Sequence, residues 1–461
     1  MRFFIRFLTS LLLLVVIAAV GFAAYAWNRS IDPIEPPQRT AFDAKLIEDG
    51  AQLAAIGNCT ACHTRPGGKS FAGGLPIPTP FGTIFSTNIT PDPETGIGRW
   101  SEEAFNRAMR EGVDRQGRHL YPAFPYDHFT KVSDADNKAL YAFLMSRPAV
   151  AQTAPANDLP FPLNMRWVLA GWKLLYFDSG AYQAATDQSD EWNRGAYLVT
   201  GLGHCGSCHT PRNSLGAETS AHLSGGEAEG WAAYAINAAS PAPVPWTVDS
   251  LYDYMRRGWH PDHGVASGPM AEVTGNLGTL PDADIRAMAV YVADLMEEPS
   301  AERAERGSLA IEHAARQGNL IELASAPAGA DTPEARGEAI YKAACSSCHE
   351  GAKPQPYGGV SFHLSSAISA PNSQNAINTV LFGLPAGSGT RSAVMPGFAA
   401  TMSDEEITDL FAYLRGTFAE KPVWPDLASR LAATRSGDYH VSVKPSDGIE
   451  RGPENIGAID Q

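Results

Sequence analysis

The chain has 461 residues, and typical domain sizes of roughly 100–200 residues predict about three domains. Hydrophobic residues make up 44% of it, which is enough to build globular cores. The formal net charge of −15 argues against a nucleic-acid-binding protein, because phosphate backbones select basic surfaces.

The N-terminal segment is predicted to cross a membrane. Arg2 and Arg6 precede an uncharged, mostly apolar run over residues 7–28. A helix of that length spans roughly 33 Å, about the thickness of a bilayer core. Residues 1–30 are therefore predicted to be an uncleaved anchor. The alternative is a cleaved signal peptide, with Ala-Tyr-Ala at 24–26 as its cleavage site. Both interpretations keep the two arginines inside and export the rest of the chain.

The six cysteines form three Cys-x-x-Cys-His motifs, at 59–63, 205–209 and 345–349. A disulfide scaffold would not place a histidine after every second cysteine. A zinc site needs paired motifs, which here lie more than a hundred residues apart, and a thioredoxin-like pair would occur once. The pattern is that of haem c attachment and predicts three covalent haems. The predicted thioether residues are Cys59, Cys62, Cys205, Cys208, Cys345 and Cys348, and the predicted proximal iron ligands are His63, His209 and His349.

Each motif belongs to a repeat with the same order of elements. A short helical stretch precedes the motif, and an amphipathic helix with apolar residues at i, i+3, i+4 and i+7 closes the repeat. The stretches begin at Gly50, Gly195 and Gly337, and the closing helices begin at Ser133, Pro281 and Ser403. Strand signals are sparse. The predicted fold is all-α, with three tandem cytochrome c domains behind the N-terminal transmembrane helix.

The predicted boundaries follow from these repeats and from the composition between them. The cytochrome c domains cover 40–150, 185–298 and 334–420; linkers cover 151–184 and 299–333; a tail covers 421–461. The first linker contains an apolar, aromatic stretch at 166–177. Packing between domains is its simplest interpretation, and docking on a partner, a quinone or the membrane surface is the alternative.

Distal iron ligands are predicted from methionines ahead of the closing helices. Met270 lies 61 residues after His209, and Met395 lies 46 residues after His349. Both are expected in loops, where a thioether sulfur can complete a His/Met haem. Met402 is a nearby alternative to Met395.

The first repeat departs from this pattern. The position 61 residues after His63 is Phe124, whose side chain cannot ligate iron. His128 is predicted to be the distal ligand of the first haem. The alternatives are ligation by His119 and a five-coordinate iron. Two imidazoles stabilise ferric iron better than His and Met, so a His/His haem would have the lower potential.

At this point the chain resembles a known family, the three-haem cytochrome c subunits of membrane-associated bacterial dehydrogenases. The resemblance covers roughly residues 40–420. It rests on Gly57–Thr64, Phe81–Trp100, Gly117–Ala123, Gly203–Arg212, Gly268–Glu272 and Met395–Phe398. The family includes the subunits that partner quinoprotein alcohol dehydrogenases, gluconate-type flavin dehydrogenases and molybdenum hydroxylases.

The resemblance implies that a partner subunit oxidises the substrate and that electrons cross three haems to ubiquinone or a terminal oxidase. It implies a location at the periplasmic face of the bacterial inner membrane. With Phe124 in place of methionine and an N-terminal anchor that is expected to be retained, the chain resembles one subgroup more than the others. This subgroup comprises the cytochrome partners of molybdenum hydroxylases acting on aldehydes, nicotinate or isoquinoline. No catalytic residue is predicted in this chain. A free-standing respiratory relay and a haem peroxidase are the alternative functions.

Overall fold

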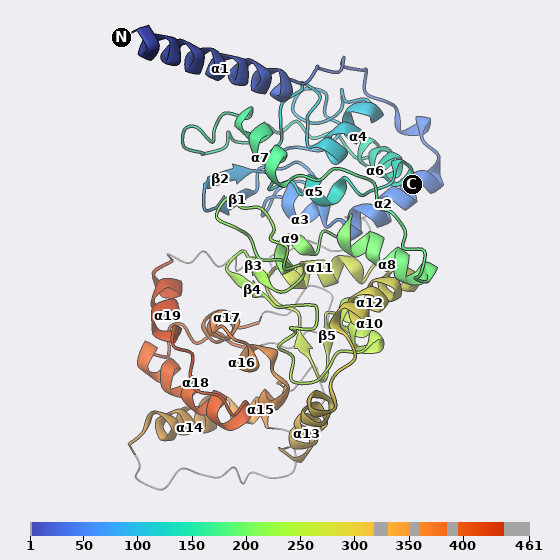
Figure 1. Ribbon diagram of the computed structural model, residues 1–461. Coiled ribbons are helices and arrows are strands. Elements are labelled where there is room, and N and C mark those ends of the chain that lie inside the picture. The colour runs from blue at the N-terminus through green and yellow to red at the C-terminus, as the bar shows by residue number, and fades with distance from the viewer. Residues whose placement is uncertain (1, 318–330, 351–358, 385–394, 438–461) are drawn as a thin grey trace. The chain divides into compact units, whose positions relative to one another are not determined.

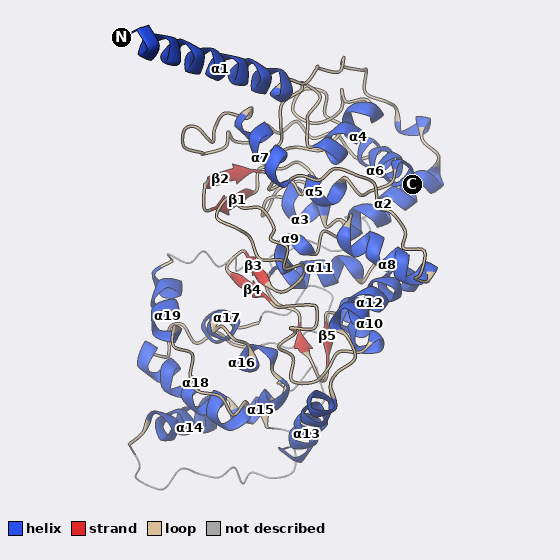
Figure 2. Ribbon diagram, in the orientation of Figure 1, coloured by secondary structure: helices blue, strands red, loops and turns tan. Residues whose placement is uncertain are grey.

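The computed structural model describes residues 2–317, 331–350, 359–384 and 395–437. The chain divides into two compact units, residues 1–183 and 184–461, and each is described by itself (Figure 1). Helices dominate both units, and the strands among the described residues form small two-stranded antiparallel sheets (Figure 2). The all-α prediction is confirmed.

The first unit begins with the helix α1, Arg2–Ala26, none of whose residues is buried. This helix is long and apolar enough to cross a membrane by its length and composition. The other elements of this unit are η1 (Arg39–Ala41), α2 (Ala44–Ile56), α3 (Cys59–His63), β1 (Pro76–Thr79), β2 (Gly82–Phe85), α4 (Glu102–Glu111), α5 (Tyr126–Phe129), α6 (Asp134–Met145) and α7 (Val168–Tyr176).

The second unit contains the remaining elements. Its first half comprises α8 (Asp190–Thr200), α9 (Gly206–His209), β3 (Gly226–Ala228), β4 (Trp231–Ala233), α10 (Val248–Arg257), β5 (Trp259–His260), β6 (Gly264–Val265), α11 (Pro269–Leu277) and α12 (Asp282–Met296). Its second half comprises α13 (Ala301–Gln317), α14 (Pro333–Ala344), α15 (Ser346–His349), η2 (Phe362–Leu364), α16 (Ser366–Ser369), α17 (Gln374–Phe382), α18 (Asp404–Phe418) and α19 (Leu427–Ser436).

One helix pair recurs three times, as α2 with α6, α8 with α12, and α14 with α18. Each pair crosses so closely at a glycine that no side chain fits there. A Cβ on Gly50 would lie 2.0 Å from the carbonyl oxygen of Ala139. The equivalent distances are 1.9 Å for Gly195 with Ala287 and 2.0 Å for Gly337 with Asp409. The backbones can meet only because these glycines lack a Cβ.

The closing helices α6 and α18 begin with side-chain caps, whereas Pro281 at the start of α12 provides none. The Ser133 hydroxyl accepts a hydrogen bond from the backbone N–H of Asp136 at 3.1 Å. Ser403 and Glu406 form a full capping box, in which each side chain bonds the backbone N–H of the other residue. These caps satisfy N–H groups that would otherwise lack partners at the start of the helices.

The segments outside the repeats are more ordered than expected. The predicted second linker contains the helix α13, and His313 on it meets His363 edge to face, with ring centroids 5.1 Å apart. The predicted tail begins with packed residues, because Trp424, Leu427 and Leu431 are buried in the core cluster of the third repeat. The packed core therefore continues beyond residue 420.

Candidate haem sites

Each Cys-x-x-Cys-His motif lies on or beside a short helix that follows the first helix of a pair. These short helices are α3, α9 and α15, and each ends at the motif histidine. The turn from the long helix into the motif brings the cysteines and the histidine close together. The order of long helix, short helix and motif histidine is therefore the same in all three repeats, although the motifs are far apart in the sequence.

The three motif histidines share one hydrogen bond to the backbone. In each case Nδ1 faces a carbonyl oxygen of the same repeat. The distances are 2.7 Å from His63 to Thr87, 2.6 Å from His209 to Tyr234 and 2.8 Å from His349 to Val360. A carbonyl only accepts, so Nδ1 carries the proton and Nε2 keeps its lone pair for a metal. This orienting bond is what an iron-binding imidazole requires, so the residues fit a haem.

Burial sets the protonation states of the motif side chains. Loss of hydration lowers the pKa of all three motif histidines, which keeps their imidazoles neutral. Burial raises the pKa of Cys59 and Cys205 to about 12 and that of Cys345 to about 11. A neutral imidazole is the form that can bind a metal through its unprotonated nitrogen.

The loops after the first two motifs match each other in detail. Thr64 Oγ1 accepts the N–H of Phe71 at 3.1 Å, and Thr210 Oγ1 accepts the N–H of Leu223 at 3.1 Å. Phe71 and Leu223 both have a positive φ, 62° and 54°, which is uncommon for residues with a side chain. Glu350 stands in the place of this threonine in the third motif, and residues 351–358, which follow it, lie outside the described residues.

Met270 lies in a helix rather than in the predicted loop. It is half-buried in the first turn of α11, which starts with Pro269. Proline favours this position because the first helical N–H needs no partner within the helix. Gly268 precedes it with φ 55°, and a Cβ there would lie 2.7 Å from ring atoms of Trp231. The indole of Trp231 thus packs directly on the segment that carries Met270.

Met395 is held by a backbone bridge to Leu384. The N–H of each residue donates to the carbonyl of the other, at 3.0 Å and 2.9 Å. Met395 and its alternative Met402 are both half-buried against the core of the third repeat. Residues 385–394, which connect the two sides of the bridge, lie outside the described residues.

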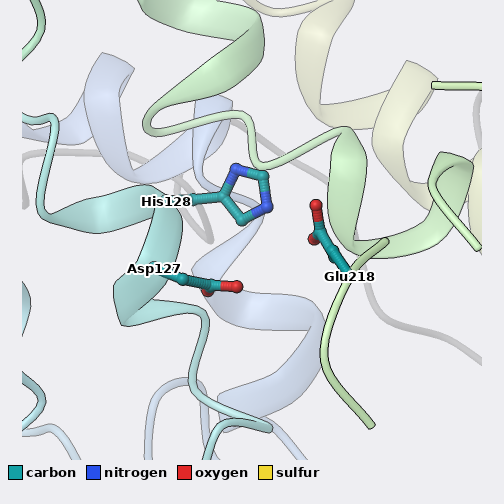
Figure 3. A group of neighbouring side chains, drawn as sticks. All are labelled: Asp127, His128 and Glu218. Atoms are coloured by element: carbon teal, nitrogen blue, oxygen red, sulfur yellow. The ribbon is translucent and has the colours of Figure 1, made fainter. Parts of the chain in front are cut away.

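In the first repeat, two aromatic rings meet edge to face at the position of the missing methionine. Phe124 is half-buried, and its ring centroid is 5.2 Å from that of Phe129. His128 is buried, with 4% of its surface exposed, and projects from the short helix α5 beside Asp127 (Figure 3). Glu218, which Figure 3 also labels, belongs to the second unit.

His119, the alternative ligand of the first haem, is bonded to the segment that follows α1. Its Nε2 lies 2.9 Å from the carbonyl oxygen of Ala26 and 3.3 Å from Nδ2 of Asn28. Its own carbonyl accepts a hydrogen bond from Arg166 at 3.0 Å. These bonds give His119 a structural role next to the end of α1.

Comparison with known proteins identifies the family to which this chain belongs. The family models "Cytochrome c" and "Cytochrome C oxidase, cbb3-type, subunit III" match residues 47–148 and 332–414. The gluconate 2-dehydrogenase cytochrome c subunit of Pantoea cypripedii is 36% identical over 93% of this chain and 95% of its own length. The chain belongs to the cytochrome c subunits of dehydrogenases. The family resemblance seen in the motifs is confirmed, and covalent haem c and an electron-transfer role follow from membership.

Two further relatives show the range of this cytochrome family. The cytochrome c subunit of the quinone-dependent alcohol dehydrogenase of Gluconobacter oxydans is 35% identical over 81% of this chain and 78% of the relative. A nicotinate dehydrogenase subunit of Pseudomonas putida is 46% identical over 91% of this chain. The chain spans only about a third of that relative, 34% of its length.

Sequence reasoning missed the groups that orient the histidines of this cytochrome. They are the carbonyls of Thr87, Tyr234 and Val360, which lie 24, 25 and 11 residues after their histidines. Every residue has a carbonyl, so no residue type marks these positions. The Gly/Pro-rich loops between motif and closing helix were the available signal, because such loops fold back on the motif.

Proposed function

We propose that this cytochrome carries three covalent haems c and passes electrons from a catalytic dehydrogenase subunit to ubiquinone or a terminal oxidase. The observation that carries the proposal is the same Nδ1–carbonyl bond at all three motif histidines. Each haem, when bound, supplies one-electron chemistry, while the protein supplies ligands, spacing and exclusion of water.

The residues that would hold the haems are those predicted from the motifs. The six motif cysteines would form the thioethers, and His63, His209 and His349 would bind iron through Nε2. Met270 and Met395 would be the distal ligands of the second and third haems. His128 would be the distal ligand of the first, which gives that haem a lower potential than the other two.

The number of haems is tested by pyridine haemochrome analysis of the purified full-length protein, with intact mass as a second measurement. Wild type is expected to contain three haems per chain. The Cys205→Ser/Cys208→Ser variant is expected to contain two, because only the second motif is lost. Two haems in wild type would contradict the proposal.

The proposed partner is a molybdenum hydroxylase that oxidises an aldehyde or a nitrogen heterocycle such as nicotinate; a quinoprotein dehydrogenase is the alternative. The support is the 46% identity to the nicotinate dehydrogenase subunit, against 34% to 36% for the gluconate, fructose and alcohol dehydrogenase cytochromes. Co-purification of the tagged protein from solubilised membranes tests this. A protein that runs without any dehydrogenase would favour the free-standing relay.

We also propose that α1 anchors the chain in the inner membrane with the haems on the periplasmic side. The helix α7 supports this location. Trp167, which directly precedes α7, meets Phe22 of α1 edge to face, with ring centroids 5.9 Å apart. Trp167, Leu174 and Leu175 are 52%, 66% and 68% exposed, which is unusual for so apolar a group. Phe22 is near the end of α1, so the exposed side of α7 would lie at the depth where aromatic side chains favour the bilayer interface.

A further inference from the structure

The strand β4 contacts both ligand segments of the second repeat. Tyr234 directly follows this strand, and its carbonyl accepts the hydrogen bond from Nδ1 of His209 at 2.6 Å. Trp231, the first residue of β4, packs on Gly268, two residues before Met270. A shift of β4 would therefore move the supports on both the proximal and the distal side of the second haem.

A helix of the third repeat holds β4 by its backbone. Asn375 on α17 accepts the N–H of Ala232 at 2.8 Å, and its amide donates to the carbonyl of the same residue at 2.9 Å. The side chain thus forms the pair of bonds that a neighbouring strand would form. One turn further along α17, Asn378 donates to the carbonyl of Gly230 at 2.9 Å. Figure 1 shows α17 beside β4, as these bonds require.

Further hydrogen bonds, within α17 and to α19, orient the Asn378 amide that faces β4. Gln374 donates to Oδ1 of Asn378 at 2.8 Å and to Oγ1 of Thr434 on α19 at 3.1 Å. Asn378 and Gln374 are fully buried, with 0% and 1% of their surfaces exposed. Because Oδ1 of Asn378 accepts from Gln374, its Nδ2 must point at β4. The bond from Gln374 thus holds the Asn378 amide in a single orientation, in which it can donate to Gly230.

The other end of α17 supports the distal segment of the third repeat. Leu384, two residues beyond α17, forms the backbone bridge with Met395. Phe398 donates its N–H to the carbonyl of Val380 on α17 at 2.9 Å. The helix α17 thus contacts the ligand support of the second repeat through its first turns. Its C-terminal end contacts the ligand support of the third repeat.

The proximal side of the third repeat is also close to the second. Val360, whose carbonyl bonds His349, lies beside the turn between β5 and β6. A Cβ on Gly264 would be in ordinary van der Waals contact with Val360, at 3.8 Å from Cγ2. The second repeat therefore also contacts the residue that supports the proximal ligand of the third.

We propose that Asn375 and Asn378 are positioning residues, which form an amide latch from α17 to β4 that fixes the second haem relative to the third. The inference rests on the proposed haem ligands and adds how two of the haems are spaced. Electron transfer between haems depends on their separation and orientation. The latch joins β4, which supports the proposed ligands of the second haem, to α17, which supports the distal ligand of the third. Hydrophobic packing alone would keep α17 and β4 together but would let them slide past each other. Paired hydrogen bonds from α17 to the strand allow only one register.

The experiment compares the full-length Asn375→Ala/Asn378→Ala protein with Asn193→Ala. Asn193 is the matched control, because its side chain forms the same two bonds with Ala185, at 2.7 Å and 2.9 Å, within the second repeat alone. Pulsed EPR on the all-ferric protein measures the distances between haems. Electron redistribution after flash reduction measures the rate of transfer between them.

The latch variant is expected to keep all its haems, to broaden one inter-haem distance and to slow redistribution by about tenfold or more, since ångström-scale misplacement of reacting centres is costly. Asn193→Ala should change neither readout. Unchanged distances and rates in the latch variant would overturn the proposal, as would an equal effect of Asn193→Ala.

If the double variant fails to incorporate haem, Asn375→Asp is measured by the same criteria, because it keeps the acceptor for Ala232 and loses only the donor. Fewer than three haems in wild type would instead count against the proposed function.

Discussion

At the scale of single residues, the haem sites depend on which nitrogen of each histidine is already engaged. His63, His209 and His349 commit Nδ1 to a carbonyl and keep Nε2 available. His119 does the reverse, because its Nε2 bonds Ala26. An imidazole whose Nε2 faces a carbonyl must break that bond before it can ligate iron through the same atom. The three motif histidines therefore differ from His119 in which ring nitrogen they leave available.

The first prediction concerns the sixth ligand of the first haem. His128→Ala is expected to convert one haem of three from low spin to high spin, because no second imidazole then reaches the iron. His119→Ala is the control and should leave the spectrum low-spin, while lowering stability through the lost bonds to Ala26. EPR and visible spectra of the ferric proteins measure both effects. Retention of all three low-spin signals in His128→Ala would refute the assignment.

The second prediction concerns the buried lysine of α7. Lys173 is 6% exposed; its ammonium donates to the carbonyl of Gly112 at 2.8 Å and lies 4.7 Å from the ring centroid of Tyr126. Burial lowers the pKa of Lys173 to about 7, well below its ordinary value of 10.5. Between these values the unfolded chain binds more protons than the folded one, so stability rises with pH.

Thermal unfolding of wild type is therefore expected to shift to higher temperature as the pH is raised from about 7 toward 10, relative to Lys173→Met. The comparison removes the contributions of all other titrating groups. Parallel curves for the two proteins over this range would show that the ammonium is stabilised by its carbonyl and ring contacts, and that burial does not lower its pKa.

At the scale of elements, the glycine crossings explain why the three repeats fold alike. Each pair of long helices must approach closely enough to hold the motif against the closing helix. The third prediction tests this in one repeat. Gly337→Ala is expected to destabilise the protein by about 1–3 kcal/mol, because its Cβ would overlap the Asp409 carbonyl.

The control for that prediction is Gly416→Ala, in the closing helix α18 of the same repeat. A Cβ on Gly416 meets nothing within 4 Å, so alanine there should stabilise the protein by roughly 0.5–1 kcal/mol through helix propensity. Denaturant unfolding measures both. Similar effects of the two substitutions would show that the crossing tolerates a wider separation of α14 and α18.

The elements that could be predicted from the sequence are those marked by side chains. The three motifs and the closing helices follow from cysteine spacing and apolar periodicity, which are local. Spacing alone predicts a loop at Met270, but Pro269 starts a helix one residue earlier. Composition alone predicts a linker over the α13 segment, although Ala and Glu are strong helix formers and a contact with η2 orders it.

The partners of the haem histidines could not be predicted, because they are backbone groups brought in by loop closure. The same is true of the latch between α17 and β4. Asn375 and Ala232 are 143 residues apart, and neither residue type is unusual at its position. Long-range pairing of a side-chain amide with backbone leaves no periodic signal, so it emerges only when the chain is folded.

At the scale of the whole molecule, the last prediction places α7 against the bilayer. A spin label is attached at Leu175→Cys in full-length protein in nanodiscs. In the proposed three-haem protein the six native cysteines are thioethers, so no other thiol would react. The label should collide more often with oxygen, which concentrates in lipid, than with a water-soluble nickel chelate. Leu215→Cys is the control, because Leu215 is 49% exposed and belongs to the other unit. It should show the opposite preference.

The collision rates of the two labels distinguish three environments for the exposed side of α7: water, a covering protein and the membrane interface. Equal behaviour of the two labels would place α7 in water, and a label at 175 reached by neither reagent would mean that a protein covers it. Oxygen preference at 175 alone would support the interfacial position, since the exposed apolar groups of α7 next to α1 can bury substantial area in the headgroup region. The first haem would then be held near the membrane through α7, because Lys173 on that helix bonds Gly112 of the first repeat.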